Sequence, residues 1–284
     1  MITRFAPSPT GPLHLGHAFS AMTASDMARA DGGVFLLRIE DIDRARSKPE
    51  WEALIFEDLG WLGLDWPRPV LRQSDRLPAY REALGRLWDE GLLYPCTCSR
   101  RDIQEAASAP QEGVRIGPDG IVYPGTCRGA PRTGPLPDSV LRLDMQMALR
   151  RIGERAFDET GPSAPGWHTI DPQTLIEGAG DVVLARRDFG TSYHLSVVLD
   201  DAHQGVTHVV RGQDLFEATA IHVVLQALLD LPVPRYHHHR LIRDETGRRL
   251  AKRDDARAIR LYREDGKTPA ELREMLGLGP QPSG

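Results

Sequence analysis

Two histidines flank a glycine near the start of the chain, in the stretch RFAPSPTGPLHLGHAFSA (residues 4–21). Residues of these types could cradle a phosphate, bind a metal ion or lie on a turn between a strand and a helix. Gly11 and Gly16 have the glycine spacing of a Walker phosphate loop, but His17 occupies the position where that loop needs a lysine. The stretch therefore does not predict a Walker loop, and His14 and His17 taken alone are compatible with ordinary histidines on a glycine turn.

The three cysteines of the chain have a spacing that could hold a metal ion. Cys96 and Cys98 form a C-x-C pair, and Tyr123 stands four residues before Cys127. Three thiolates are good zinc ligands, and a structural zinc site normally closes with a fourth ligand. Tyr123, His168 and a water molecule are the candidates for that position, and on chemistry alone histidine is the better ligand. The odd number of cysteines disfavours a disulfide framework.

Two further polar stretches carry weaker signals. The run RRLAKRDD (248–255) is basic and, taken alone, is typical of a solvated surface loop. The run YHHHR (236–240) places histidines side by side, but adjacent side chains point in different directions and no carboxylate stands at ligand spacing. We therefore expect no metal site at the histidine run.

Alternating strands and helices must position these residues. The apolar run GVFLLRIED (33–41) predicts a buried strand whose carboxyl end faces a site, and a helical pattern before it completes a strand–turn–helix–strand unit. Apolar faces predict two more helices within 48–64 and 76–94. Within 192–229 two apolar runs are predicted as strands and are followed by a helix, and a short helix is predicted in 268–277.

The expected fold is α/β, with a Rossmann-like parallel sheet and helices, split by a small zinc-binding insertion and followed by a short helical C-terminal segment. The segment 95–172 is rich in proline and glycine and contains all three cysteines, so it is predicted to be the insertion. Residues 1–94 and 173–242 are then the two halves of one Rossmann-like domain, and residues 243–284 form a basic loop and a helical tail.

Bulk composition is that of an ordinary globular protein. The chain has 284 residues, of which 40% are hydrophobic and 26% charged, enough to bury a substantial core. No apolar run approaches the ~20 residues of a membrane helix, and Pro7, Pro9, Gly11 and Pro12 interrupt any signal-peptide core. We therefore expect a cytoplasmic protein with no membrane partner. Because the net charge is −5, any nucleic acid must be held by a local basic surface.

The whole stretch RFAPSPTGPLHLGH resembles the signature of class I aminoacyl-tRNA synthetases of the glutamyl type, in which HLGH stands for the HIGH motif. The resemblance implies that His14, Gly16 and His17 bind ATP, with the phosphates at a helix N-terminus. The two imidazoles then donate to the α-phosphoryl transition state. The family's KMSKS loop aligns with residues 249–253, which keep the second lysine, replace the first with arginine and lack both serines. Lys252 is thereby implied as the third catalytic residue and as an ATP ligand.

The same resemblance implies a pocket for L-glutamate, whose side-chain carboxylate needs a guanidinium and whose α-amino group needs a carboxylate or a carbonyl. In similar proteins the glutamate site is lined by the positions that correspond here to Arg4, Ala6, Ser8, Glu40, Tyr193 and Arg211. All six are expected at strand ends or on adjoining turns. Each taken alone could be structural, for example through an ion pair of Glu40 with Arg38 or Arg44.

Within the glutamyl type, the chain resembles the glutamyl-queuosine tRNA(Asp) synthetases, in which C-x-C…Y-x-x-x-C binds zinc. This makes Tyr123 the expected fourth ligand beside Cys96, Cys98 and Cys127. Few residues follow Arg253, whereas a full glutamyl-tRNA synthetase continues into a helical anticodon-binding region. The resemblance implies a Zn²⁺-containing monomer that activates L-glutamate with ATP and Mg²⁺ without tRNA. The glutamate would then be esterified to queuosine in the anticodon loop of tRNA(Asp).

Two other functions stay open from the sequence. One is an HxGH-type ligase that hands an activated acid to a small molecule, which weak turnover of tRNA with robust pyrophosphate exchange would favour. The other is a non-catalytic RNA-binding relic, consistent with the divergent 249–253 loop and the acidic net charge. For RNA, the basic runs at 99–101, 186–187 and 248–253 are the candidate contact surfaces.

Overall fold

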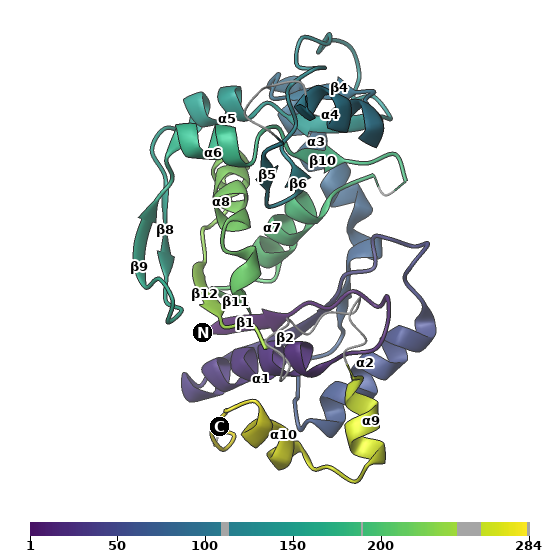
Figure 1. The fold of residues 1–284 in the computed structure, drawn as a ribbon, viewed down its shortest axis with the longest axis vertical. Coiled ribbons are helices and arrows are strands. Elements are labelled where there is room, and N and C mark those ends of the chain that lie inside the picture. Colours follow the sequence, from purple (N-terminus) through teal and green to yellow (C-terminus); the bar gives the residue numbers. More distant parts are fainter. Residues whose placement is uncertain (109–113, 189, 243–256, 283–284) are drawn as a thin grey trace.

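The computed structural model describes residues 1–108, 114–188, 190–242 and 257–282, and Figure 1 shows its course. Its helices are α1 (Leu15–Ala30), α2 (Pro49–Trp61), α3 (Leu77–Asp89), α4 (Arg100–Ser108), α5 (Met145–Ile152), α6 (Pro172–Gly178), α7 (Tyr193–His203), α8 (Ala218–Leu228), α9 (Ile259–Glu264) and α10 (Pro269–Met275), with 3₁₀ turns η1 (Gln73–Arg76) and η2 (Gln213–Leu215). Its strands are β1 (Ile2–Phe5), β2 (Val34–Ile39), β3 (Leu71–Arg72), β4 (Leu93–Cys96), β5 (Ile116–Gly117), β6 (Gly120–Ile121), β7 (Val140–Leu143), β8 (Ala156–Glu159), β9 (Gly166–Thr169), β10 (Val183–Ala185), β11 (His208–Gly212) and β12 (Arg235–His239).

Mostly parallel strands form the middle of the molecule (Figure 1). β1 pairs in parallel with β2, and β2 with β3. β11 pairs in parallel with β12, β12 pairs in parallel with β8, and β9 is an antiparallel edge strand. The two groups of strands meet where the backbone N–H of Thr207, just before β11, donates to the carbonyl of Ile2 at 3.0 Å. This arrangement confirms the predicted α/β fold with a parallel sheet.

Helix α1 packs on this sheet through small side chains. Ala18, Ala21, Ala24 and Ser25 are buried on α1, and their size lets the helix approach β1 and β2 closely. The helix ends before Gly32, whose φ of 60° lies in the left-handed region that glycine favours. Because α1 packs closely on β1 and β2, its first turn is held at the carboxyl end of β1. Open α/β sheets bind ligands at this end of their strands.

The insertion contributes a second, smaller sheet at the upper end of Figure 1, in the antiparallel order β10-β7-β4, beside the β5–β6 hairpin. This sheet begins with β4 and ends with β10, so it reaches past both limits of the predicted insertion at 95–172. β8 and β9 also belong to that segment, but β8 pairs with β12 of the main sheet. Insertion and main sheet are therefore interleaved, because strands pair by backbone hydrogen bonds whatever their separation in sequence.

The apolar run after Ser192 forms helix α7, whereas the sequence predicts a strand there. Ser192 caps the helix by accepting a hydrogen bond from the backbone N–H of Leu195 (3.4 Å). Most side chains of α7 are buried, so the run lacks the polar face that separates a helical pattern from a buried strand. Tyr193 consequently lies in the first turn of a helix and not at the end of a strand.

The apolar core has two main clusters, one around α3, α5, α7 and α8 and one around α1, α2, β1 and β2. Within the described ranges, no helix combines the length and the apolar character needed to cross a lipid bilayer.

Asp58 on α2 lies in the second cluster as a fully buried carboxylate, and no described residue offers either oxygen a hydrogen bond. Burial raises the pKa of Asp58 to about 6, and the charges of Arg263 and Arg260 offset only part of this effect. An acid whose pKa is raised by folding destabilises the native state once it ionises, so its contribution to stability is lost as the pH rises from about 4 to about 6.

We expect Asp58→Asn to raise the free energy of unfolding at pH 7.5 by roughly 1–3 kcal/mol, because it removes an unpaired buried charge. Below pH 4, where the parental side chain is also neutral, the advantage disappears. Thermal melts of both proteins at the two pH values test this, and a variant less stable than the parent at pH 7.5 would contradict it.

Candidate active site

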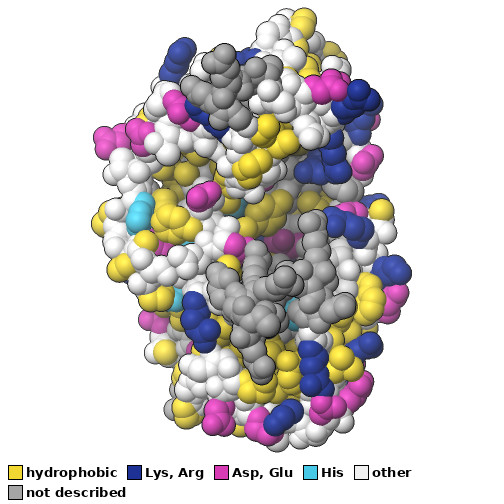
Figure 2. Space-filling view, in the orientation of Figure 1, with side chains coloured by type: hydrophobic (Ala, Val, Ile, Leu, Met, Phe, Trp, Pro, Cys, Tyr) yellow, Lys and Arg dark blue, Asp and Glu magenta, His cyan; other side chains and the backbone are white. Residues whose placement is uncertain are grey.

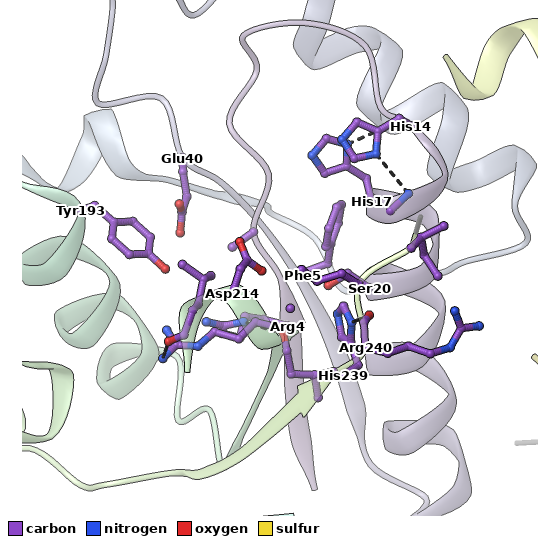
Figure 3. A pocket seen from close by; sticks show the side chains of 18 residues that line it. Arg4, Phe5, His14, His17, Ser20, Glu40, Tyr193, Asp214, His239 and Arg240 are labelled. Atoms are coloured by element: carbon purple, nitrogen blue, oxygen red, sulfur yellow. Dashed lines mark hydrogen bonds between the residues drawn. The ribbon is translucent and has the colours of Figure 1, made fainter. Parts of the chain in front are cut away.

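A cavity of about 450 Å³ lies at the carboxyl ends of β1, β11 and β12. Eight of the residues predicted from the sequence line it, namely Arg4, Ala6, His14, Gly16, His17, Glu40, Tyr193 and Arg211. Figure 3 shows Glu40 and Tyr193 at one end of this cavity, His14 and His17 at the other, and Arg4 between them. The residues predicted for an amino acid and those predicted for a nucleotide therefore face one space.

Ser8 lies in a neighbouring cavity of about 310 Å³, which shares Glu40 and Tyr193 with the first. Arg46 and Arg186 also line this second cavity, which we call the side cavity. Ser8 is thus adjacent to the predicted glutamate residues without lining the central cavity.

Lys252 lies outside the described residues, but the chain on either side of its segment borders the central cavity. Leu241 and Ile242, which precede the segment, line the cavity. Ala258, which follows it, forms an antiparallel β-bridge with His14. The described residues before this segment thus line the cavity, and those after it pair with the HLGH turn.

His14 and His17 form a capping box at the N-terminus of α1. His14 Nδ1 accepts a hydrogen bond from the backbone N–H of Gly16 (3.1 Å), and His17 Nδ1 accepts one from the backbone N–H of His14 (3.2 Å). Because both Nδ1 atoms are acceptors, the single proton of each neutral ring must be on Nε2. The turn therefore supplies two Nε2–H donors, a property suited to the oxygens of a phosphate.

Asp201 on α7 orients two arginines beneath the cavity. Arg4 Nε donates to Asp201 Oδ1 (3.0 Å), and Arg38 Nη1 donates to the same oxygen (2.6 Å). Burial raises the pKa of Asp201, but the two guanidinium groups outweigh it and hold the pKa below its ordinary value. The sequence analysis did not identify Asp201 as a site residue. A carboxylate next to an apolar run was the feature that could have indicated a buried, functional acid.

Glu40 accepts a hydrogen bond from Arg38 Nη2 (3.2 Å) and faces the cavity. Burial raises the pKa of Glu40 above the ordinary 4.5, because its effect exceeds the opposing charges of Arg38 and Arg4. The ion pair with Arg38 that the sequence left as a structural alternative therefore exists, and Glu40 lines the cavity as well.

Arg211 is held by the surrounding protein through most of its hydrogen-bond donors. Nε donates to His238 Nε2 (3.1 Å), Nη1 to His222 Nδ1 (3.0 Å), and Nη2 to Thr219 Oγ1 (2.8 Å) and the Leu215 carbonyl (3.2 Å). These bonds use four of its five N–H donors, which leaves one Nη1–H for a ligand. Burial and the Arg211 charge lower the pKa of His238 to about 4 and that of His222 well below its ordinary value, so both rings are neutral near pH 7.

The sequence run YHHHR contributes one of these contacts, since His238 lies on β12. Within the part of the chain that the structure describes, the only cluster of metal-ligating side chains is formed by the three cysteines. The histidine run therefore supports Arg211, a role that its sequence did not indicate.

The cysteine cluster has the geometry of a tetrahedral metal site. The three Sγ atoms lie within 4.8 Å of one another, with Cys98 and Cys127 3.4 Å apart. Tyr123 Oη lies 3.5 Å from Cys96 Sγ and 3.4 Å from Cys98 Sγ. A tetrahedral zinc ion, about 2.3 Å from sulfur and about 2.0–2.2 Å from oxygen, separates sulfur ligands by ~3.8 Å and sulfur from oxygen by ~3.5 Å. The four side chains thus fit zinc.

His168, the alternative fourth ligand, lies elsewhere, on β9. Its ring stacks on Phe157 with centroids 5.2 Å apart, and its Nε2 is 2.7 Å from the carbonyl of Ala164. Of the two protein candidates for the fourth position, only Tyr123 lies beside the thiols.

We expect freshly prepared protein to contain about one zinc ion per chain, and Cys98→Ser to lose most of it, because each thiolate is a direct ligand. His168→Gln is the matched control and should retain the metal. Metal analysis of chelator-free protein checks both variants, and parental protein without zinc would contradict the assignment of this site.

Comparison with known proteins agrees with this geometry. The family model described as tRNA synthetases class I (E and Q), catalytic domain, matches residues 1–116 and 169–282. The glutamyl-Q tRNA(Asp) synthetase of Rhodobacter capsulatus is 69% identical over 281 residues, which are 98% of this chain and 100% of that protein. The protein of the same name from Symbiobacterium thermophilum is 42% identical over 296 residues, 98% of this chain and 87% of that protein.

Solved structures show the same fold. A glutamate tRNA ligase from Elizabethkingia meningosepticum, in complex with its amino acid, superposes with a TM-score of 0.70 at 28% identity over 89% of this chain. The superposition covers 52% of that ligase, so this chain spans about half of its length. A methionyl-tRNA synthetase from Mycobacterium tuberculosis superposes with a TM-score of 0.58 at 12% identity. The superposition covers 97% of this chain and 63% of the synthetase, and at this identity it shows a shared fold alone.

Proposed function

Because this chain belongs to the glutamyl-Q tRNA(Asp) synthetases, ligases of the class I E and Q group, we propose that it activates L-glutamate with ATP in the absence of tRNA. We further propose that it transfers the glutamyl group to the queuosine base in the anticodon loop of tRNA(Asp). The observation that carries the proposal is the central cavity, which is lined by Arg4, Arg211 and Glu40 together with His14 and His17 of the HLGH turn.

Activation joins the two ends of this cavity. Arg4 and the remaining Nη1–H of Arg211 would bind carboxylate oxygens of glutamate, and Glu40 would bind its α-ammonium group. The substrate α-carboxylate attacks the α-phosphorus of ATP, an oxygen–phosphorus bond forms, and the bond to pyrophosphate breaks. The Nε2–H donors of His14 and His17 would stabilise the charge that develops on the phosphate oxygens. Mg²⁺ bound to ATP would neutralise part of the phosphate charge.

Transfer requires a hydroxyl group to reach the activated carboxyl carbon. A hydroxyl of the queuosine cyclopentenediol attacks this carbon, an ester bond forms, and AMP leaves with the electron pair of the broken bond. Bases in single-stranded loops are accessible to proteins in this way because they can be unstacked. The side cavity adjoins the glutamate residues and is lined by Arg186 and by Arg46, which pairs with Asp43; these two cations support entry of an anticodon-loop backbone from this side.

The surface around the cavity agrees with an RNA partner. Figure 2 shows a central hollow with acidic and hydrophobic side chains on its floor, and Lys and Arg side chains, with some Asp and Glu among them, along its right-hand side. A tRNA substrate supports a cytoplasmic site of action. None of the four proposed zinc ligands lines the central cavity, so zinc would hold the insertion together and take no part in the reaction.

ATP–pyrophosphate exchange with L-glutamate and no RNA is the experiment that tests activation. We expect exchange that saturates with glutamate, and much weaker exchange with glutamine, which lacks the second carboxylate that an arginine binds. Exchange that begins only when tRNA is added would contradict tRNA-independent activation. No exchange under any condition would favour a non-catalytic RNA-binding protein.

A further inference from the structure

A row of side chains runs from Arg211 to the β5–β6 hairpin of the insertion. Arg211 Nη1 lies 3.0 Å from His222 Nδ1, His222 Nε2 lies 3.0 Å from His194 Nδ1, and His194 Nε2 lies 2.9 Å from Asp119 Oδ1. His222 and His194 are 2% and 3% exposed, whereas the Asp119 side chain is 48% exposed. Asp119 stands in the turn between β5 and β6. The row therefore joins the central cavity to a surface turn of the insertion.

The proton positions along this row follow from Arg211. A guanidinium can only donate, so His222 Nδ1 must accept and His222, as a neutral ring, carries its proton on Nε2. That proton faces His194 Nδ1, which must then accept in its turn. The remaining proton of His194 is therefore on Nε2 and is donated to the Asp119 carboxylate. Every donor in the row meets an acceptor, and only one set of tautomers achieves this.

Asp119 is the acceptor that closes the row. Burial raises its pKa, but the hydrogen bond from His194 and the nearby positive charges, those of Arg186 and Arg142 among them, together outweigh this effect and lower the pKa below its ordinary value. Without this carboxylate, the buried Nε2–H of His194 loses its acceptor. The proton of His194 could then move to Nδ1, where it would face the Nε2–H of His222. Either His222 or Arg211 must reorient to relieve that conflict.

We propose that Asp119 is a positioning residue for glutamate binding, which acts through His194 and His222 to hold the Arg211 guanidinium toward the substrate. The proposal rests on the proposed function, because it takes Arg211 as a ligand of glutamate. It gives the β5–β6 hairpin a role in the chemistry of the cavity, since a surface carboxylate of the insertion sets the geometry of a buried arginine.

A second set of contacts limits the size of the effect. His238 accepts from Arg211 on its other side, and its Nδ1 is hydrogen-bonded to Glu159. Glu159 also accepts from the backbone N–H of Gly161 (2.6 Å), where a Cβ atom would lie 2.3 Å from the carbonyl of His238. This second arm is buried and does not involve the hairpin. Loss of Asp119 should therefore loosen Arg211 and not displace it.

The test compares Asp119→Ala with Asp119→Asn, whose amide oxygen can still accept from His194. Asp138→Asn is the matched control, because Asp138 is an exposed carboxylate of the same insertion. In glutamate-dependent pyrophosphate exchange, we expect Asp119→Ala to raise the KM for glutamate about tenfold, the size typical of a buried donor that loses its acceptor. The KM for ATP and the kcat should change less than twofold. Asp119→Asn and the control should stay near the parental values.

A second readout reports on the row without reference to glutamate. In ¹⁵N-histidine NMR spectra, with His194 assigned by its loss in His194→Gln, the parental His194 should show the Nε2–H tautomer. Asp119→Ala should shift it toward the Nδ1–H form, and Asp119→Asn should not. If the tautomer shifts but the KM for glutamate does not, the positioning role is wrong. If the tautomer is unchanged in Asp119→Ala, the row itself is wrong. Absence of glutamate exchange in the parental protein would instead contradict the proposed function and leave the NMR result to decide the row.

Discussion

Replacing Lys252 with alanine lowers the rate of glutamate-dependent pyrophosphate exchange by about 10²–10³-fold, the size typical of losing one preorganised donor to a developing charge. The ammonium group would contact phosphates whose charge is redistributed as pyrophosphate leaves, so the loss falls on the transition state. Lys252 is assigned this role because it keeps the second lysine of the KMSKS motif, and the described residues Leu241 and Ile242, just before its segment, line the cavity. The dissociation constant for glutamate should change little.

The control for Lys252→Ala is Lys267→Ala, which removes a lysine that pairs with Glu271 on the surface near α10. The control should keep the parental exchange rate, and its glutamate affinity measured by calorimetry should be unchanged. A Lys252→Ala variant that exchanges pyrophosphate at the parental rate would show that the alignment of residues 249–253 with the KMSKS loop is wrong.

Replacing Glu40 with glutamine raises the KM for glutamate on the order of 10²-fold, because the substrate ammonium group then lacks a charged partner in a buried site. Glutamine has nearly the same shape, and its amide oxygen can still accept from Arg38, so the fold should be retained. Glu50→Gln is the control, since Glu50 lies exposed on α2. A Glu40→Gln variant with the parental KM would show that the α-ammonium group binds elsewhere.

The pH dependence of glutamate binding follows from the same carboxylate. Glu40 must be ionised to bind an ammonium group, and burial raises its pKa above 4.5. As the pH falls through this raised pKa, Glu40 becomes protonated and the KM for glutamate rises. This rise begins at a higher pH than an ordinary glutamate would cause. Exchange assays over a pH series should show the rise in the parental protein and a flatter profile in Glu40→Gln.

The family resemblance, together with the predicted strands and turn, was sufficient to identify the residues that lie on the turn and strand ends of the main sheet. His14, Gly16 and His17 lie on the glycine turn and the first turn of α1, Arg4 lies in β1, and Glu40 comes directly after β2. The cavity brings these residues together because the carboxyl ends of parallel strands meet at one edge of a sheet. The cysteine spacing likewise indicated a cluster that the structure brings within ligand distance.

The partners of these residues could not be predicted in the same way. Asp201 lies 197 residues along the chain from Arg4, and His222 lies on a different element from Arg211; both stand on helices whose apolar faces look like ordinary core. Their roles depend on how α7 and α8 pack, which no local pattern specifies. The same packing buries α7 on most sides, and this removed the periodicity that would have separated a helix from a strand.

The identity of the acceptor is the central claim, and one transfer assay tests it most directly. tRNA(Asp) that carries queuosine is compared with the same tRNA that carries unmodified guanosine, each with an intact or a periodate-oxidised 3′ end, with the cyclopentenediol of queuosine protected during oxidation. We expect labelled glutamate on the queuosine form whether or not its 3′ terminus is intact, and none on the guanosine form. Transfer to the guanosine form, or transfer that requires the intact 3′ terminus, would contradict the proposal and assign the chain the activity of an ordinary glutamyl-tRNA synthetase.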